Sequence, residues 1–167
     1  RNEITEKALA ALSPRPTRVS AASLRVPERI EKVEFHRDLI WLIGSSTGGT
    51  QALTQIMTRL PKHIPPVLIV HHIPPVFSKA FAESLNALCP FTVKEAEDGE
   101  TVSEGHVYIA PGGKQMALRR NGVRYTIEIN DDEPVNRFKP SVDYLLNSAA
   151  SYDKIRAVAG ILTGMGR

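Results

Sequence analysis

Short continuous apolar runs alternate with amphipathic helical patterns from residue 39 onward, and this alternation constrains the fold more than any other feature. The runs at 39–43 and 67–70 contain no polar residue, as expected of strands that are buried on both faces. The βαβ order predicts an α/β fold, with a doubly wound, mostly parallel sheet between two helical layers. Apolar residues recur at helical spacing after each run: Leu53, Ile56, Met57 and Leu60, then Phe77, Phe81, Leu85 and Leu88.

An antiparallel hairpin is predicted as an insertion in the middle of the chain. Asn121-Gly122 lies between two runs in which apolar and polar residues alternate, the strongest short-range signal for a hairpin. Strands are also predicted at 91–94 and 107–110, before the hairpin. After it, Ser141 is expected to cap a helix.

The two ends of the chain differ in character. Residues 1–38 hold a short helical pattern and then a proline-containing stretch without sustained periodicity. They are predicted to be the end of a preceding domain and a linker, with a disordered chain end as the alternative. Residues 39–167 are the predicted α/β domain, whose last predicted buried strand is 157–162. Because the covering helix should begin where the chain stops, we expect the domain's C-terminal strand and helices to be missing.

Composition argues against several classes of function. The formal net charge is only +3, and no basic stripe with interleaved aromatic residues is present, which argues against nucleic-acid binding. The longest apolar runs are too short for insertion into a membrane. A single cysteine, Cys89, excludes an intrachain disulfide and fits a reducing compartment, so a cytoplasmic location is predicted. His71-His72 has no cysteine or carboxylate at ligand spacing, and we expect neither a metal nor another cofactor.

The stretch Gly44-Ser45-Ser46-Thr47-Gly48 joins the first predicted strand to the first predicted helix. As a phosphate loop it lacks the Walker lysine, and its glycines have the wrong spacing for a dinucleotide fingerprint. As a nucleophile turn it matches Gly-x-Ser-x-Gly, which raises Ser46 above the sheet beside unpaired backbone N–H groups. The motif alone leaves two alternatives open, serines that only cap the helix and an anion site at the helix N-terminus.

A serine hydroxyl needs a base to become a good nucleophile. His71 and His72 end the next predicted strand, and neighbouring strands lie about 5 Å apart. An imidazole can therefore reach Ser46. Because adjacent strand residues point to opposite faces, we expect at most one of the two to do so. A structural role for the histidines is the alternative.

Six stretches lie in the following order within 38–167: IGSSTGGT, VHHIPPVFSKAFAESLN, VKEAEDGE, GHVYIAPGGKQM, NRFKPSVDYL and GILTGMG. Together they resemble the catalytic domain of chemotaxis receptor methylesterases, a family of protein-glutamate methylesterases and glutamine deamidases. The resemblance implies a doubly wound α/β domain with an added hairpin. It also implies a Ser-His-Asp hydrolase that cleaves γ-glutamyl methyl esters on receptor cytoplasmic helices and releases methanol. The implied partners are those receptors and a phosphorylatable receiver domain, with residues 1–38 as its last helix and linker.

The resemblance also implies roles for individual residues. Ser46 matches the nucleophile and His72 matches the base, whereas His71 lies where other members carry varied polar residues. The backbone N–H groups of Thr47 and Met165 match the oxyanion donors.

The end of the chain departs from the family pattern. The triad aspartate would directly follow Arg167, where this sequence stops. Loss of such an aspartate costs on the order of 10⁴ in rate, so we expect a chain of this length to be nearly inactive. Arg137, Lys139 and Ser141 match a motif near the family's substrate cleft and receive no individual roles. A non-catalytic receptor- or anion-binding module with the same fold is the alternative function.

Overall fold

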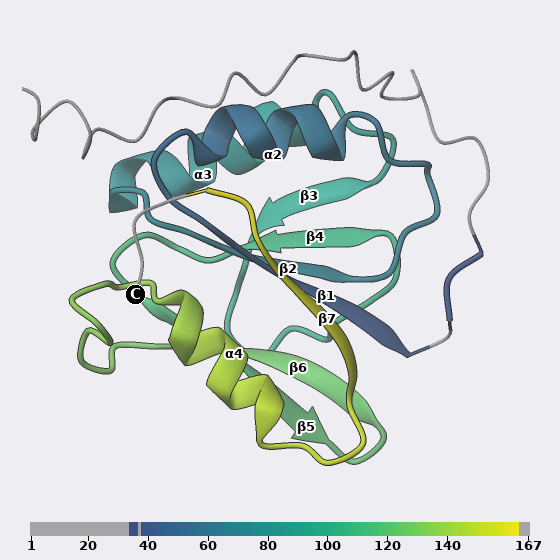
Figure 1. Cartoon of the computed structure of the whole chain (residues 1–167), viewed down its shortest axis with the longest axis vertical. Helices are drawn as coiled ribbons and strands as arrows, with labels where there is room; N and C mark the ends of the chain where they lie inside the picture. Colours follow the sequence, from purple (N-terminus) through teal and green to yellow (C-terminus); the bar gives the residue numbers. More distant parts are fainter. Residues whose placement is uncertain (1–33, 37, 164–167) are drawn as a thin grey trace, which may run out of the picture.

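The computed structural model of the chain describes residues 34–36 and 38–163. The helix end and linker predicted for residues 1–38 lie mostly outside these described residues, so that domain division stays a prediction. The described part consists of a sheet, three helices and a hairpin, whose arrangement is shown in Figure 1.

Five strands form a sheet in the order β3-β4-β2-β1-β7. Every neighbouring pair in this sheet is parallel, which confirms the predicted parallel arrangement. Because β1 lies between β2 and β7, its carboxyl end is flanked by the carboxyl ends of two other strands. The strands are β1 (Leu39–Ser45), β2 (Val67–His71), β3 (Thr92–Glu95), β4 (His106–Ile109) and β7 (Arg156–Ile161).

Helices lie on both sides of the sheet, as a doubly wound fold requires (Figure 1). α2 (Gly49–Met57) and α3 (Pro75–Asn86) cover one side. α4 (Val142–Ala150) and the antiparallel hairpin of β5 (Gln115–Asn121) and β6 (Arg124–Asn130) lie on the other side. The hairpin predicted from Asn121-Gly122 is therefore confirmed.

Alternate residues of the central strands pack into two separate hydrophobic cores. Val67 and Ile69 pack in the core that includes α2 and α3, whereas Leu68 and Val70 pack in the core that includes α4 and the hairpin. All four side chains are fully buried. This two-sided burial explains why the strand run contains no polar residue.

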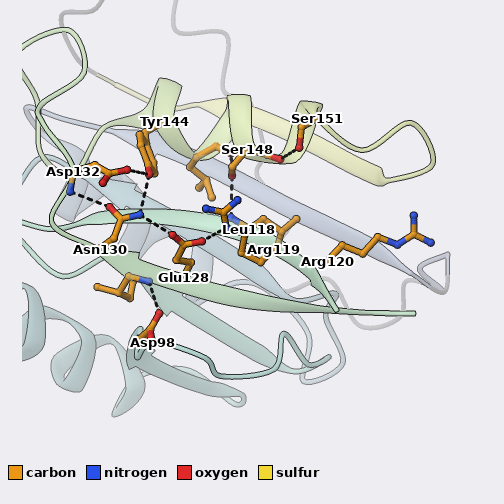
Figure 2. Close-up of polar contacts among 12 residues, drawn as sticks. Asp98, Leu118, Arg119, Arg120, Glu128, Asn130, Asp132, Tyr144, Ser148 and Ser151 are labelled. Carbon is orange, nitrogen blue, oxygen red and sulfur yellow. Dashed lines mark hydrogen bonds and ion pairs between the residues drawn. The ribbon is translucent and has the colours of Figure 1, made fainter. Parts of the chain in front are cut away.

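Polar contacts join the hairpin to its surroundings (Figure 2). The backbone N–H of Leu118 in β5 donates to Ser148 Oγ in α4 at 2.9 Å, and Asn130 in β6 donates to Tyr144 OH at 2.8 Å. On the hairpin itself, Arg119 forms an ion pair with Glu128 across the two strands. These contacts hold α4 against β5 and β6, and so fix the loop that connects β6 to α4.

The buried face of α3 differs from the predicted one. The predicted face included Phe77 and Leu88, but these side chains are 57% and 58% exposed. Ser78 and Ala82 are buried instead, together with Leu85, which was predicted correctly. Helical spacing fits both faces equally well. The buried one is fixed by tertiary contacts, because Ser78 Oγ accepts a hydrogen bond from the Gly112 N–H at 3.0 Å.

The last predicted strand is present as β7, but it is not buried in the described part of the chain. Val158 is 55% exposed and Ile161 is 71% exposed. β7 pairs with β1 along one edge, and among the described residues no strand pairs with its other edge. The apolar run therefore predicted the strand correctly but not its exposure.

Two helix ends also differ in detail from the sequence prediction. α2 ends at Met57, although Leu60 is still buried in the same core. Ser141 occupies the N-cap position of α4 as predicted, but its side chain makes no capping hydrogen bond. Its backbone N–H donates instead to the side-chain oxygen of Gln115 at 2.9 Å.

Candidate active site

The turn between β1 and α2 carries Ser46 at the carboxyl edge of the sheet. The Ser46 N–H donates to the Thr163 carbonyl at 2.9 Å, and the Gly49 N–H donates to the Ser46 carbonyl at 2.7 Å. Gly48, at the N-cap of α2, has a φ of 77°, which glycine adopts without steric cost. The turn is thus tied to the residues after β7 and to the first turn of α2.

Close packing explains the glycines on either side of the turn. A Cβ on Gly44 would lie 2.6 Å from a methyl group of Val142 in α4. A Cβ on Gly49 would lie 2.7 Å from the His71 ring and 2.8 Å from Ser45 Oγ. Both separations are below van der Waals contact, so the side chains around the turn approach as closely as they do only because these positions lack a Cβ.

Two serine–histidine pairs bridge the ends of β1 and β2. Ser45 and His71 are register partners, with Ser45 Oγ 3.0 Å from His71 Nδ1. Ser46 Oγ lies 3.2 Å from His72 Nδ1. Because adjacent residues point to opposite sides, one imidazole faces Ser46 and the other faces Ser45. The Ser45–His71 pair was missed by the sequence analysis, although the same alternation would have indicated it.

The two pairs differ in burial. Ser45 and His71 are only 2% and 5% exposed, on the side of the sheet covered by α2 and α3. Ser46 and His72 are half-buried. The second pair is therefore the one that a substrate can approach.

Both imidazoles favour the neutral form. Burial is the main cause that lowers the pKa of His71, and a hydrogen bond with the Ser45 backbone acts in the opposite direction. Burial also lowers the pKa of His72, and the charge that His71 would carry lowers it further. A neutral His72 can accept a proton at Nδ1, which is the state required of a base for Ser46.

The second nitrogen of His72 faces a different environment. Nε2 is buried and has no hydrogen-bond partner within the described residues, and the same holds for the Thr163 hydroxyl. When Nδ1 accepts a hydrogen bond from Ser46, a neutral ring carries its proton on Nε2. Each of these buried groups is thus suited to an acceptor such as a carboxylate.

The comparisons with known proteins agree with this fold. The family model for the CheB methylesterase matches residues 41–167. The chain belongs to the CheB methylesterase family. Its structure resembles the crystal structure of the Thermotoga maritima CheB methylesterase catalytic domain, with a TM-score of 0.72 and 42% identity. The match covers 77% of this chain and 68% of that one.

Two similar curated proteins are both named protein-glutamate methylesterase/protein-glutamine glutaminase. The protein-glutamate methylesterase/protein-glutamine glutaminase of Pectobacterium atrosepticum is 47% identical over 156 residues, or 87% of this chain. The protein of that name from Salmonella typhimurium is 55% identical over 124 residues, or 74% of this chain. The matched regions are 45% and 36% of these relatives, so the chain spans less than half of their length.

The remaining residues that the resemblance selected differ in their surroundings. Thr47 is exposed, and no acceptor within the described part of the chain takes its backbone N–H. Met165 lies outside the described residues. Lys139 pairs with Asp131, whereas Ser141 is buried. Arg137 is exposed and has a φ of 71°, in the left-handed region.

Two further findings concern the described residues. Within them, no three or more His, Cys, Asp or Glu side chains converge to hold a metal ion. In the same part of the chain, no helix has the length and apolar character needed to span a membrane.

Proposed function

We propose that this chain carries the nucleophile and base of a protein-glutamate methylesterase and glutamine deamidase that acts on the cytoplasmic helices of chemotaxis receptors. The single observation that carries the proposal is the approach of Ser46 Oγ to His72 Nδ1, at 3.2 Å. Family membership supports it, because the relatives are named for these two activities. The position at the carboxyl ends of parallel strands, where sites of α/β sheets lie, supports it further.

In the proposed reaction, His72 Nδ1 takes the proton of Ser46 while Oγ forms a bond to the ester carbonyl carbon of a glutamyl methyl ester. The imidazolium then returns that proton to the methoxy oxygen as the carbon–oxygen bond breaks, and methanol leaves. Water attacks the acyl-serine in the same way, so that a glutamate side chain and free Ser46 are restored. With a glutamine substrate the proton goes to the amide nitrogen, and ammonia leaves.

The backbone N–H groups of Thr47 and Met165 are proposed to stabilise the oxyanion of the tetrahedral intermediate. Support for Thr47 is its place just before α2, where an N–H without an acceptor among the described residues and the positive end of the helix dipole favour a developing negative charge. Removal of one oxyanion donor costs roughly 10² to 10³ in rate in a serine hydrolase.

A carboxylate is proposed as the third member of the triad, in contact with His72 Nε2. Support comes from the two buried donors that lack a partner among the described residues, His72 Nε2 and the Thr163 hydroxyl. Such a group would fix the ring tautomer with the proton on Nε2 and stabilise the imidazolium. By resemblance it would be the aspartate that directly follows the position of Arg167.

The proposal also covers the rest of the protein. The relatives are more than twice as long as the region that matches this chain. We infer a cytoplasmic protein in which a receiver domain, linked through residues 1–38, regulates access to Ser46.

Labelling with a tagged fluorophosphonate tests this function. We expect covalent labelling of Ser46, abolished in Ser46→Ala and strongly slowed in His72→Gln. Ser45→Ala and His71→Gln are the matched controls, because they alter the buried pair one residue away, and both should retain labelling. In a protein extended through the proposed aspartate, release of methanol from a methylated receptor fragment should follow the same order.

The opposite result would favour another class of protein. Labelling that persists in Ser46→Ala would refute the assignment of the nucleophile. An unreactive folded protein that includes the proposed aspartate and still binds receptor helices would indicate a non-catalytic binding module.

A further inference from the structure

One face of the His72 ring is covered by a side chain to which no role was assigned. The ring of Phe138 lies on it with a centroid separation of 3.8 Å and an interplanar angle of 5°. Phe138 belongs to the β6–α4 loop, residues 131–141. Its own outer face is partly open, because the side chain is 37% exposed.

A tight turn presents Phe138 to the histidine. Val135 and Phe138 exchange two backbone hydrogen bonds, at 3.1 and 3.0 Å. The two residues between them, Asn136 and Arg137, have φ values of 52° and 71°. Positive φ at both central positions is the signature of a type I′ turn, which has few conformational alternatives.

A buried glutamine in β5 holds this turn in place through hydrogen bonds. Gln115 is 0% exposed. Its side-chain nitrogen donates to the carbonyls of Glu133 and Phe138, at 3.0 and 3.4 Å. Its side-chain oxygen accepts the Ser141 N–H at 2.9 Å. One side chain of β5 thus fixes the start, the middle and the end of the segment that carries Phe138.

We propose that Phe138 is a positioning residue for His72, and that Gln115 acts through it by fixing the β6–α4 loop. The inference rests on the proposed role of His72 as the base for Ser46.

The physical argument concerns rotation of the imidazole. The second side-chain torsion of histidine has broad minima, so the ring turns easily when nothing contacts its faces. A parallel ring at 3.8 Å blocks this rotation, because a turning imidazole would push its edge into Phe138. The stacked arrangement therefore fixes the plane of the ring, and within that plane the contact with Ser46 Oγ keeps Nδ1 directed at the serine. A displacement of about 1 Å in such a contact can cost on the order of 100-fold in rate.

The first experiment measures the rate at which the fluorophosphonate labels Ser46. We expect Phe138→Ala to slow labelling by roughly 10- to 100-fold, with a smaller loss in Phe138→Leu. Phe138→Tyr keeps a planar ring and should restore a rate near that of the unchanged chain. Phe77→Leu is the matched control, because this exposed phenylalanine has no ring partner in the described residues. Labelling of Phe138→Ala at the full rate would overturn the proposal.

The second experiment observes the His72 ring directly by NMR and does not depend on reactivity. Its ring protons should be shifted upfield by the stacked phenyl ring, and its nitrogen shifts should report one dominant tautomer. In Phe138→Ala we expect loss of the upfield shift and nitrogen shifts closer to those of free histidine. If the protein extended through the proposed aspartate is not labelled at all, the proposed function fails. The NMR result then still decides whether Phe138 orders the His72 ring. An unchanged tautomer in Phe138→Ala would refute the positioning role of Phe138.

A double-mutant cycle tests the part played by Gln115. Gln115→Met keeps the side-chain length and removes the hydrogen bonds, so it should slow labelling when Phe138 is present. In the Phe138→Ala background the same change should add little, because the group through which it acts is already gone. Equal slowing in both backgrounds would show that Gln115 acts by another route. If Gln115→Met does not fold, as judged by circular dichroism, Gln115→Asn tests the same point with a shortened amide.

Discussion

At the scale of single residues, the buried His71 makes the stability of this domain depend on pH. The folded state lowers the pKa of His71 from an ordinary value of 6.5, mainly through burial. Its contribution to stability is therefore fully present above pH 6.5 and is lost as the pH falls below that value, because the unfolded chain binds the proton more readily. His72 has a lowered pKa as well and acts in the same direction.

We predict that His71→Gln weakens this acid sensitivity. The free energy of unfolding of the unchanged chain should fall between pH 7.5 and 5.5, by at most about 1.4 kcal/mol per pH unit for each histidine. A glutamine at position 71 can still contact Ser45 but does not titrate, so the decline should become shallower while the part due to His72 remains. Urea unfolding at several pH values measures the effect, and an identical slope in both proteins would contradict it.

The residue scale also shows what the sequence could reveal about the site. The strand ends predicted that Ser46 would meet one of His71 and His72, because parallel strands bring such positions to one edge, and the resemblance selected His72. The structure places His72 beside Ser46, and the roles of the two residues remain a proposal. Phe138 was not found, because a loop residue carries no periodic signal. Its contact with His72 arises from the turn and from Gln115, which form only once the hairpin and α4 are packed.

At the scale of elements, the contact between β1, β2 and α2 depends on the missing side chain of Gly49. A Cβ there would lie 2.7 Å from the His71 ring, which is itself buried and cannot move into solvent. The start of α2 can therefore approach the sheet as closely as it does only with glycine. This requirement follows from packing rather than from backbone conformation, because Gly49 is the first residue of α2.

We predict that Gly49→Ala destabilises the domain by about 1 to 3 kcal/mol, the usual cost of overpacking a core. Gly160→Ala is the matched control, because a Cβ at Gly160 in β7 meets nothing within 4 Å in the described residues. It should change stability by less than about 0.5 kcal/mol. Denaturant midpoints of the two variants test this, and equal midpoints would show that the turn relaxes without cost.

The sequence predicted well which helices and strands form, and less well which of their faces are buried. The strands, helices and hairpin of the described residues were all anticipated by their periodicity. The exposed Phe77 shows the limit, because helical spacing cannot distinguish two apolar faces that differ by one residue. β7 shows another limit, since an apolar run indicates a strand but not whether its faces are covered.

At the scale of the whole molecule, two hydrophobic cores share one sheet. Leu68 belongs to the core with α4 and the hairpin, and Ile69, the next residue, belongs to the core with α2 and α3. Because the same backbone carries both, neither core can lose its packing without disturbing the other. We therefore expect the described part of the chain to unfold as one cooperative unit.

The test uses Trp41, the single tryptophan of the chain, which packs against the core with α2 and α3. Leu68→Ala and Ile69→Ala should each lower the free energy of unfolding by about 2 to 5 kcal/mol. In both variants, Trp41 fluorescence and far-UV circular dichroism should report one coincident transition. Separate transitions in Leu68→Ala would show that the two cores unfold independently.

The two adjacent serine–histidine pairs give this protein an internal standard for chemical labelling. They contain the same functional groups, with oxygen–nitrogen separations of 3.0 and 3.2 Å. In the folded chain a serine-directed reagent must choose between neighbours that differ mainly in which side of the sheet they occupy. The ratio of modification at Ser46 to that at Ser45 therefore reports what the two sides of the sheet add to the same pair of groups, in access and in activation. In denaturant both serines lose their histidine partners and modification should cease at both, so a single peptide can report both folding and the occupancy of the site.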